Sequence, residues 1–236
     1  MKNKFVFIFL FLSLTFTAFA GQDLTPLLGG SVKSDRWIIN REKQQEEFIG
    51  NVSYKNEIYS LTADYGLSNR AQNTFLLKGN IIASQTLPDT FTQIKAQEFF
   101  YNNKTAKGYA LGNNKKQIES LYKTPNNIFT LYGDRLDFDR QENLFKLSSY
   151  AELNDLNNTL YADTITFNTQ SGIFEAFGKR PVLWGFGIDG DYALQADKIT
   201  ADTQKGVFKA EGNIQGWLTL ASDFEKIKQA TSKKQE

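Results

Sequence analysis

Six copies of one sequence pattern run along the chain, and this repeat limits the folds that it can adopt. Each copy begins at a polar residue that we take as its reference position. The six reference positions are Asp35, Asp64, Gln97, Asp134, Asp163 and Asp197. In the clearest copies, apolar residues stand two and four places after the reference residue and again eleven and thirteen places after it. All six copies carry Asn or Asp at the fifth place, and five carry Gly at the fifteenth.

The spacing of apolar residues within a copy is that of β-strands. Alternating apolar positions on both sides of a polar turn, such as NTQSG at 168–172, predict a hairpin. One hairpin cannot bury its apolar face alone, whereas a stack of hairpins encloses a continuous interior. The sequence therefore predicts an all-β protein, in which about six bent hairpin repeats form two facing antiparallel sheets.

Two recurrent positions predict where the chain turns and bends. Asn and Asp bond to nearby backbone groups and tolerate the left-handed region, and the late glycines supply positive φ. The apolar parity switches near the reference position, so a β-bulge or sharp bend there would keep all apolar side chains facing one interior. The alternative role for these Asp and Asn residues is a calcium ladder. It would need several oxygen ligands within one short glycine-rich turn, and the sequence does not place them so.

Composition excludes several kinds of chemistry. The 236 residues contain no Cys and no His, which rules out thiolate chemistry, disulfides, a histidine general base and a zinc site with nitrogen or sulfur ligands. Lys+Arg 27 against Asp+Glu 26 gives no electrostatic case for a nucleic-acid partner.

No catalytic site is predicted. A catalytic site usually interrupts a repeat with unexpected polar residues on its core face, and the repeat shows none. Paired carboxylates for glycan hydrolysis stay open as a distant alternative, although no pair stands out. We therefore predict that the chain is not an enzyme and that it needs no cofactor or metal.

The string GFGIDG at 185–190 matches the GxGxxG pattern of dinucleotide-binding loops. In those proteins the loop follows a strand and opens a helix, whose N-terminus meets the pyrophosphate. Here the next segment, DYALQADKIT, has the pattern of a strand that enters the sixth copy. The string is therefore predicted to be a flexible connection between copies.

The chain is divided by composition into four segments. Residues 1–20 have a basic start, an apolar stretch and the small pair Ala18 and Ala20, and are predicted to be a secretory signal peptide cleaved near Ala20. An uncleaved membrane anchor is the alternative. Residues 21–31 are predicted to be a linker, 32–220 the β-domain and 221–236 a polar tail that forms a short helix or stays frayed. An exported protein without cysteine is typical of the bacterial periplasm.

The repeat places a large set of apolar side chains in the predicted interior. These residues are Leu61, Phe75, Leu77, Ile94, Phe99, Tyr101, Leu131, Leu136, Phe138, Phe145, Leu160, Ile165, Phe167, Phe174, Leu194, Ile199 and Phe208. A dry, closed core explains them fully, since each buried ring contributes roughly 1.5–3 kcal/mol. An open interior that holds acyl chains would use the same residues. Periodicity does not separate these two alternatives.

Several short motifs resemble one known family. FIGNVSY at 48–54, IYSLTADY at 58–65 and LLKGNIIA at 76–83 are similar to strand endings and strand starts of the OstA-like, or LptA, family of lipopolysaccharide-transport proteins. The same motifs recur in LYADTITF at 160–167, LQADKITA at 194–201 and AEGNIQG at 210–216. The likeness covers roughly residues 35–218. Two departures are the length of the chain and the absence of the glycine in the fourth copy.

The resemblance implies a taco-like β-jellyroll that holds acyl chains between its two sheets. It implies lipopolysaccharide as ligand, and the inner-membrane transporter complex and the outer-membrane translocon as partners through edge strands. It also implies head-to-tail self-association into a periplasmic bridge. Unpaired terminal strands make such contacts physically reasonable, because they offer backbone donors and acceptors to a neighbour.

The sequence and the resemblance together give one leading hypothesis for function. We expect a non-enzymatic periplasmic carrier that holds the lipid A acyl chains of lipopolysaccharide in its apolar interior and passes them from the inner to the outer membrane. The alternatives are an LptC-type, membrane-anchored component of the same system and a structural β-repeat protein of the cell envelope that binds no lipid.

Overall fold

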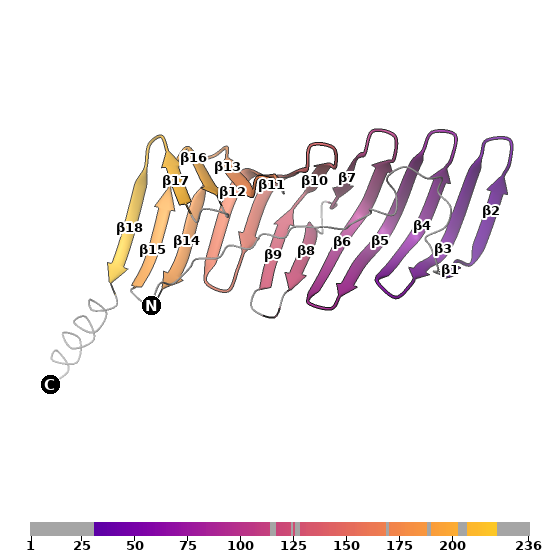
Figure 1. Ribbon diagram of the computed structural model, residues 1–236, viewed down its shortest axis with the longest axis horizontal. Helices are drawn as coiled ribbons and strands as arrows, with labels where there is room; N and C mark the ends of the chain where they lie inside the picture. The colour runs from indigo at the N-terminus through magenta and orange to yellow at the C-terminus, as the bar shows by residue number, and fades with distance from the viewer. Residues whose placement is uncertain are drawn as a thin grey trace.

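The computed structural model describes residues 31–113, 117–123, 125, 128–168, 170–187, 190–202 and 207–220. Throughout this part of the chain the regular structure is β-strand, as predicted (Figure 1). The strands are β1 (Ser31–Lys33), β2 (Arg36–Asn40), β3 (Gln45–Lys55), β4 (Tyr59–Asn69), β5 (Thr74–Leu87), β6 (Thr90–Asn102), β7 (Lys107–Leu111), β8 (Ile118–Lys123), β9 (Ile128–Gly133), β10 (Arg135–Asp139), β11 (Leu144–Asn154), β12 (Asn158–Asn168), β13 (Ile173–Phe177), β14 (Val182–Gly187), β15 (Gly190–Gln195), β16 (Lys198–Asp202), β17 (Val207–Glu211) and β18 (Gln215–Leu220). The predicted signal peptide and the predicted tail lie outside the described residues. No helix in the described part of the chain has the length and apolar character needed to cross a membrane.

The strands hydrogen-bond into one antiparallel sheet of 18 strands, which bends along a line across its middle. The long strands β3, β4, β5, β6, β11 and β12 run through the bend. Elsewhere two consecutive short strands take the place of one long strand, with the break at the bend. The pairing register shifts at this line, for example between Ile49 and Val52 on β3 and between Ser148 and Ala151 on β11. The extra residues are the fifteenth and sixteenth of a copy, such as Gly50–Asn51, and they lie opposite the reference residue of the next copy, here Asp64. The predicted bulge is therefore present at these strands, but on the strand that pairs with the reference residue and not at that residue itself.

The bend divides the structure into two halves, and the chain segments follow one another in the same order in both. Sheet I runs β2-β3-β4-β5-β6-β7-β10-β11-β12-β13-β16-β17. Sheet II runs β1-β3-β4-β5-β6-β8-β9-β11-β12-β14-β15-β18. Figure 1 shows the strands stacked along the long axis, from indigo β1 and β2 at one end to yellow β18 at the other.

The bend is held by the reference Asp of one copy and the Gly–Asn pair that follows later in the same copy. Gly79 has φ +74, and a Cβ atom there would lie 2.2 Å from Asp64 Oδ2. The side-chain amide of Asn80 donates to the same Asp64 oxygen over 2.9 Å. Two other copies make the same amide–carboxylate bond, from Asn51 to Asp35 and from Asn213 to Asp197. The reference carboxylates in these copies therefore stabilise the bend.

The Asn or Asp at the fifth place of each copy forms the turn at the end of sheet I. Asn168 Oδ1 accepts from the backbone N–H groups of Gln170 and Ser171, over 3.1 and 2.8 Å. Asn40, Asn69, Asn102 and Asp139 accept backbone N–H groups in the same manner. The predicted turn-forming role is confirmed in these five copies, and the turn of the sixth lies outside the described residues.

The two sheets face each other across one apolar core. A Cβ atom on Gly133 of sheet II would lie 2.6 Å from Leu147 Cδ1 of sheet I. Further from the bend, Phe174 of sheet I and both Leu160 and Leu183 of sheet II line the same small cavity. The buried apolar residues form a cluster that extends from Val52 on β3 to Ala201 on β16. The predicted pair of facing sheets is therefore present, as the two halves of one bent sheet.

Candidate ligand-binding interior

Strand pairing aligns the inward side chains in rows that cross the strands. In sheet I one row passes through Leu77, Phe99, Leu136 and Ile165, each in register with the next strand of the stack. A second row, nearer the turns, passes through Phe75, Tyr101, Phe138, Phe145, Phe167 and Phe174. Because side chains on one face of a strand recur at every second residue, both rows point to the same side of sheet I.

The predicted interior residues come together as expected. Leu77, Ile94, Leu131, Leu136, Leu160, Ile165, Phe167, Phe174 and Ile199 are buried in one cluster, and Leu61, Phe75, Phe99, Phe145 and Leu194 pack against it. Tyr101 is buried, and the half-buried Phe138 stacks on it with ring centroids 5.8 Å apart. The side chain of Phe208 lies outside the described residues. The placement of the described residues says nothing about lipid binding, which stays a prediction.

A glycine in the third copy makes room for a ring from the fourth. Gly108 occupies a position where most other copies carry Phe, and it lies in register with Phe138. A Cβ atom on Gly108 would come within 2.4 Å of the Phe138 ring. That ring also stacks on Phe99 at 5.7 Å. The apparent gap in the repeat is therefore filled from the neighbouring strand, and the aromatic row continues through it.

The interior is closely packed. A cavity between the sheets has a volume of about 10 Å³. It is lined by the apolar residues Phe129, Leu153, Leu160, Phe174 and Leu183 and by the polar residues Asp155 and Asn158. That volume holds one water molecule. An acyl chain can enter at this place only if the two sheets move apart.

Both ends of the stack expose inward-facing apolar side chains. At the N-terminal end Trp37 on β2 is 58% exposed and stacks on Phe48, with ring centroids 5.5 Å apart. At the C-terminal end Leu218 on β18 is 66% exposed, although its register partner Tyr192 packs against the core. Within the described residues, the end strands β2 and β17 of sheet I and β1 and β18 of sheet II each pair on one side. The ends therefore offer both apolar surface and backbone hydrogen-bonding groups.

Buried polar residues interrupt the interior, contrary to our prediction that the core face carries none. Gln85, Thr92 and Ser120 are 3%, 5% and 2% exposed, and all three lie on sheet II in its N-terminal half. Burial also raises the pKa of the nearby Tyr122 phenol. The prediction was wrong because the repeat pattern was tested mainly on the parts of each copy that form sheet I. The alternation along β6 could have predicted one of these residues, because Thr92 stands two and four residues before Ile94 and Ala96 and therefore lies on the same face of the strand.

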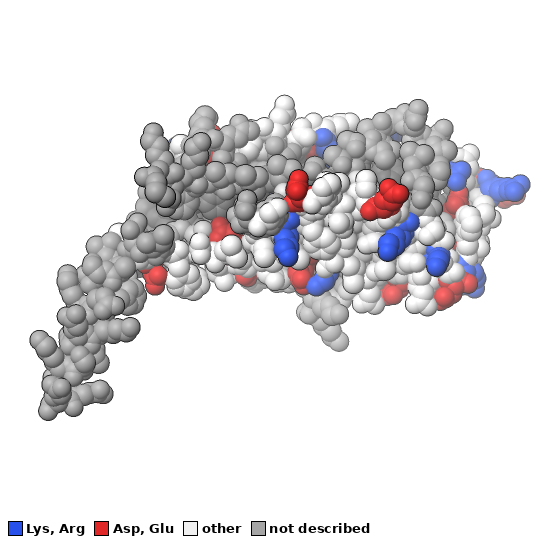
Figure 2. Space-filling model, turned by 60° about the horizontal axis from the view of Figure 1, so that its bottom comes forward, with Lys and Arg blue, Asp and Glu red and all other residues white. Residues whose placement is uncertain are grey.

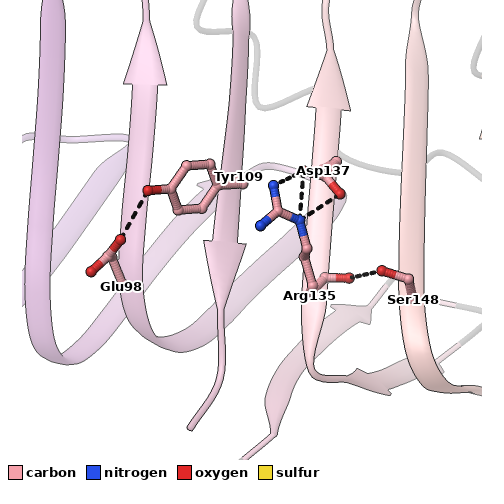
Figure 3. Close-up of polar contacts among 5 residues, drawn as sticks. All are labelled: Glu98, Tyr109, Arg135, Asp137 and Ser148. Atoms are coloured by element: carbon pink, nitrogen blue, oxygen red, sulfur yellow. Dashed lines mark hydrogen bonds and ion pairs between the residues drawn. The ribbon is translucent and has the colours of Figure 1, made fainter.

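The outer face of sheet I carries paired charges and partly covered rings. The Tyr109 hydroxyl donates to a Glu98 carboxylate oxygen over 2.9 Å (Figure 3). The Arg135 guanidinium donates to the Asp137 carboxylate, and its central carbon lies 4.9 Å from the centroid of the Tyr109 ring. Burial and the bond to Glu47 raise the pKa of the Tyr65 phenol to about 12. Acidic and basic side chains are interspersed on the face that Figure 2 displays. Such pairing is typical of a solvated surface.

The described residues of the GFGIDG string belong to two paired strands, contrary to the predicted flexible connection, and Ile188 and Asp189 lie outside the described residues. Gly185 belongs to β14 and Gly190 to β15, and these strands pair in register from Val182–Gln195 to Gly187–Gly190. A Cβ atom on Gly185 would lie 2.4 Å from Asn158 Oδ1, so close packing against that side chain explains this glycine. A strand follows the string where a dinucleotide site needs a helix.

Comparison with known proteins relates the chain to one family. The family model described as LptA/(LptD N-terminal domain) LPS transport protein matches residues 31–173. Among solved structures, the chain is similar to LptH of Pseudomonas aeruginosa, the LptA-homologous periplasmic component of the lipopolysaccharide transport device in that organism. The identity is 14%, the match covers 63% of this chain and 81% of LptH, and the TM-score is 0.29. No protein with a curated description matches the chain.

Proposed function

Since the chain belongs to the LptA/LptD N-terminal-domain family of lipopolysaccharide transport proteins, we propose that it is a periplasmic carrier. This family has no enzymatic activity. The carrier holds the lipid A acyl chains of lipopolysaccharide between sheets I and II and passes them from the inner to the outer membrane. Energy comes from a separate ATPase, in line with the failure of the GFGIDG string to form a nucleotide-binding loop.

The observation that carries this proposal is the continuous apolar interior. Buried apolar side chains extend from Val52 on β3 to Ala201 on β16, and they come from both sheets. A carrier for several acyl chains needs apolar surface of this extent, together with polar surroundings outside it. The packed interior requires the sheets to separate as chains enter, and the bend line is the place at which such a movement would pivot.

The exposed ends of the stack support a role as one segment of a bridge. A strand added to β2, β17, β1 or β18 would satisfy the backbone groups of that edge and would extend the interior into the neighbour. Trp37 and Leu218 would then be covered. Partners of this kind are other components of the transport system or a second copy of the chain.

A photo-crosslinking amino acid introduced in cells tests the proposed ligand. At Phe174, which is buried in the interior, we expect light-dependent capture of lipopolysaccharide. At Glu175, the next residue on β13, the side chain faces outward beside Thr166 and Thr200, and no capture is expected. Equal capture at both positions, or none at Phe174, would contradict the carrier function.

Close packing of the interior favours a second candidate, a structural β-repeat protein that binds no lipid. The two candidates differ in what purified protein contains: native mass spectrometry of the protein from its own envelope should show bound lipid only for a carrier. The same spectrum gives the mass of the mature N-terminus. Cleavage near Ala20 supports the carrier, whereas an intact N-terminus supports an LptC-type anchored component.

A further inference from the structure

Given the proposed function, on which this step rests, we propose that the N-terminal half of the interior binds the oxygen-bearing part of an acyl chain. The oxygen belongs to a chain hydroxyl or an ester, and it is bound by a polar row on sheet II. The polar row consists of Tyr59, Gln85, Thr92, Ser120 and Tyr122. The ligand class is therefore an amphipathic lipid whose acyl chains are hydroxylated or esterified along their length.

The polar row faces the interior. Tyr59, Gln85, Thr92 and Tyr122 are in register across the neighbouring strands β4, β5, β6 and β8. Ser120 lies two residues before Tyr122 on β8 and therefore on the same face. Its register partners are Ile94 and Leu131, and both belong to the buried apolar cluster.

One member of the row has an unmet hydrogen-bonding requirement. Gln85 Nε2 donates to the Tyr59 hydroxyl over 3.2 Å, so that pair is at least partly satisfied. Ser120 Oγ is buried and has no hydrogen-bond partner among the described residues. A buried hydroxyl without a partner destabilises the fold relative to an apolar side chain of the same size. Packing therefore does not explain the serine, whereas a ligand oxygen would.

The repeat itself does not require a polar residue at this place. Ser120 stands in the transverse row next to the one through Gln85, Thr92 and Tyr122. On the C-terminal side of Ser120, this second row of sheet II continues through Leu131, Leu153, Leu160, Leu183 and Leu194. These leucines belong to the apolar cluster or pack against it. Ser120 is thus a polar exception in an otherwise apolar row, unlike Asp155 and Asn158 at the C-terminal cavity, which bond to each other.

A hydroxyl or ester oxygen has the chemistry that the row can bind. The serine hydroxyl donates one hydrogen bond and accepts two, so it pairs equally with a chain hydroxyl or a carbonyl oxygen. In apolar surroundings such a bond is worth more than in water, and a site that binds a hydroxyl discriminates against the analogue that lacks it. A plain saturated chain would leave Ser120 unpaired and would bind more weakly.

Competition between two fatty acids that differ by one hydroxyl tests this preference. Purified mature protein is loaded with a fluorescent fatty acid, which is then displaced by myristate or by β-hydroxymyristate. We expect β-hydroxymyristate to bind roughly fivefold more tightly than myristate, the effect of about one neutral hydrogen bond. With Ser120→Ala most of this preference should be lost, while the affinity for myristate is retained.

Two further variants protect the test against a folding defect. Thr92→Val keeps the shape of the side chain and removes a second hydroxyl of the row, so it should also reduce the preference. Ser84→Ala removes a hydroxyl from the outward face of β5, where Ser84 bonds to Gln93 over 3.2 Å, and should leave the preference unchanged. Circular dichroism confirms that each variant is folded.

The outcomes separate this inference from the function on which it rests. If wild-type protein binds both fatty acids equally, the polar row is not a recognition site, and the carrier function stands. The same conclusion follows if Ser120→Ala and Thr92→Val both keep the full preference. If wild-type protein binds neither fatty acid and Phe174 captures no lipopolysaccharide, the carrier function fails as well.

Discussion

Individual residues at the bend show how much of this fold depends on one backbone conformation. Gly79 adopts a positive φ, and its missing side chain leaves room for the Asp64 carboxylate that Asn80 binds. A residue with a Cβ atom would meet both the conformational cost and the contact. The glycine is therefore required twice over, once for its φ and once for its size.

Gly79→Ala should lower the free energy of unfolding by about 1–3 kcal/mol, because a strained left-handed residue carries a cost of that order. Urea denaturation of both proteins measures the difference. Gly66→Ala is the matched control, since Gly66 lies on neighbouring β4 and the nearest side-chain atom to its Cβ would be 3.4 Å away. That change should be nearly neutral. A Gly79→Ala protein as stable as the wild type would refute the requirement for glycine at the bend.

Among the strands, β11 in the fourth copy is the exception to the rule that glycine forms the bend. It has Ser149 and Tyr150 where other copies have Gly and usually Asn, and both adopt positive φ, at 63° and 59°. Asp134 still donates its backbone N–H to Ser149 O over 3.2 Å. Strand β11 therefore bends as the other long strands do, but with two residues that disfavour the conformation.

Restoring the repeat at this strand should stabilise the protein. Ser149→Gly relieves left-handed strain and adds the backbone entropy cost of glycine, so we expect a net gain of about 0.5–1 kcal/mol in the free energy of unfolding. Ser148→Gly, one residue earlier and without positive φ, should lose about 0.5–1 kcal/mol. Equilibrium urea denaturation distinguishes the two signs. A loss of stability in both variants would show that Ser149 contributes something other than its backbone conformation.

The strands, turns and bends could be predicted from the sequence because local residues determine them. Asn168 and Gly79 act on neighbours within their own copy, so a repeat makes their roles visible. The placement of Phe138 over Gly108 depends on strand register, which one copy alone does not reveal. Ser120 and Gln85 were missed because they lie on parts of the strands outside the most regular positions. Whether the interior is open depends on how closely the two sheets approach, and periodicity carries no information on that distance.

At the scale of the whole molecule, both ends of the stack as described combine exposed apolar side chains with strands that pair on one side. β2 at one end and β18 at the other present Trp37 and Leu218 beside backbone groups that pair on one side within the described residues. Natural proteins usually protect such edges with charges, particularly lysine. The edge strands do carry Lys33, Arg36 and Lys209, but Trp37 and Leu218 remain exposed beside them, which fits a surface meant for a neighbour.

Charged substitutions at these ends should therefore weaken self-association. We expect wild-type protein to form larger species as its concentration rises, and Trp37→Lys or Leu218→Lys to shift this association to higher concentration by about tenfold or more, because each buries a charge at the contact. Sedimentation velocity over a concentration series measures the effect. Ile128→Lys is the control, since Ile128 is exposed on the outer face of β9, in the middle of the sheet II strand order and away from both ends. Equal association of all variants would exclude the ends as the contact.

The order of the strands has a consequence for how the protein is made. Each segment that crosses the bend pairs with the segments immediately before and after it in the chain, in both sheets. Contacts between sequence neighbours close short loops, so structure can grow one segment at a time from any starting point. At every stage the growing edge is the template for the next segment. Strands β17 and β18 form such an edge, and within the described residues each of them pairs on one side. A partner strand that docks there repeats the pairing step by which each segment of this chain joins the one before it.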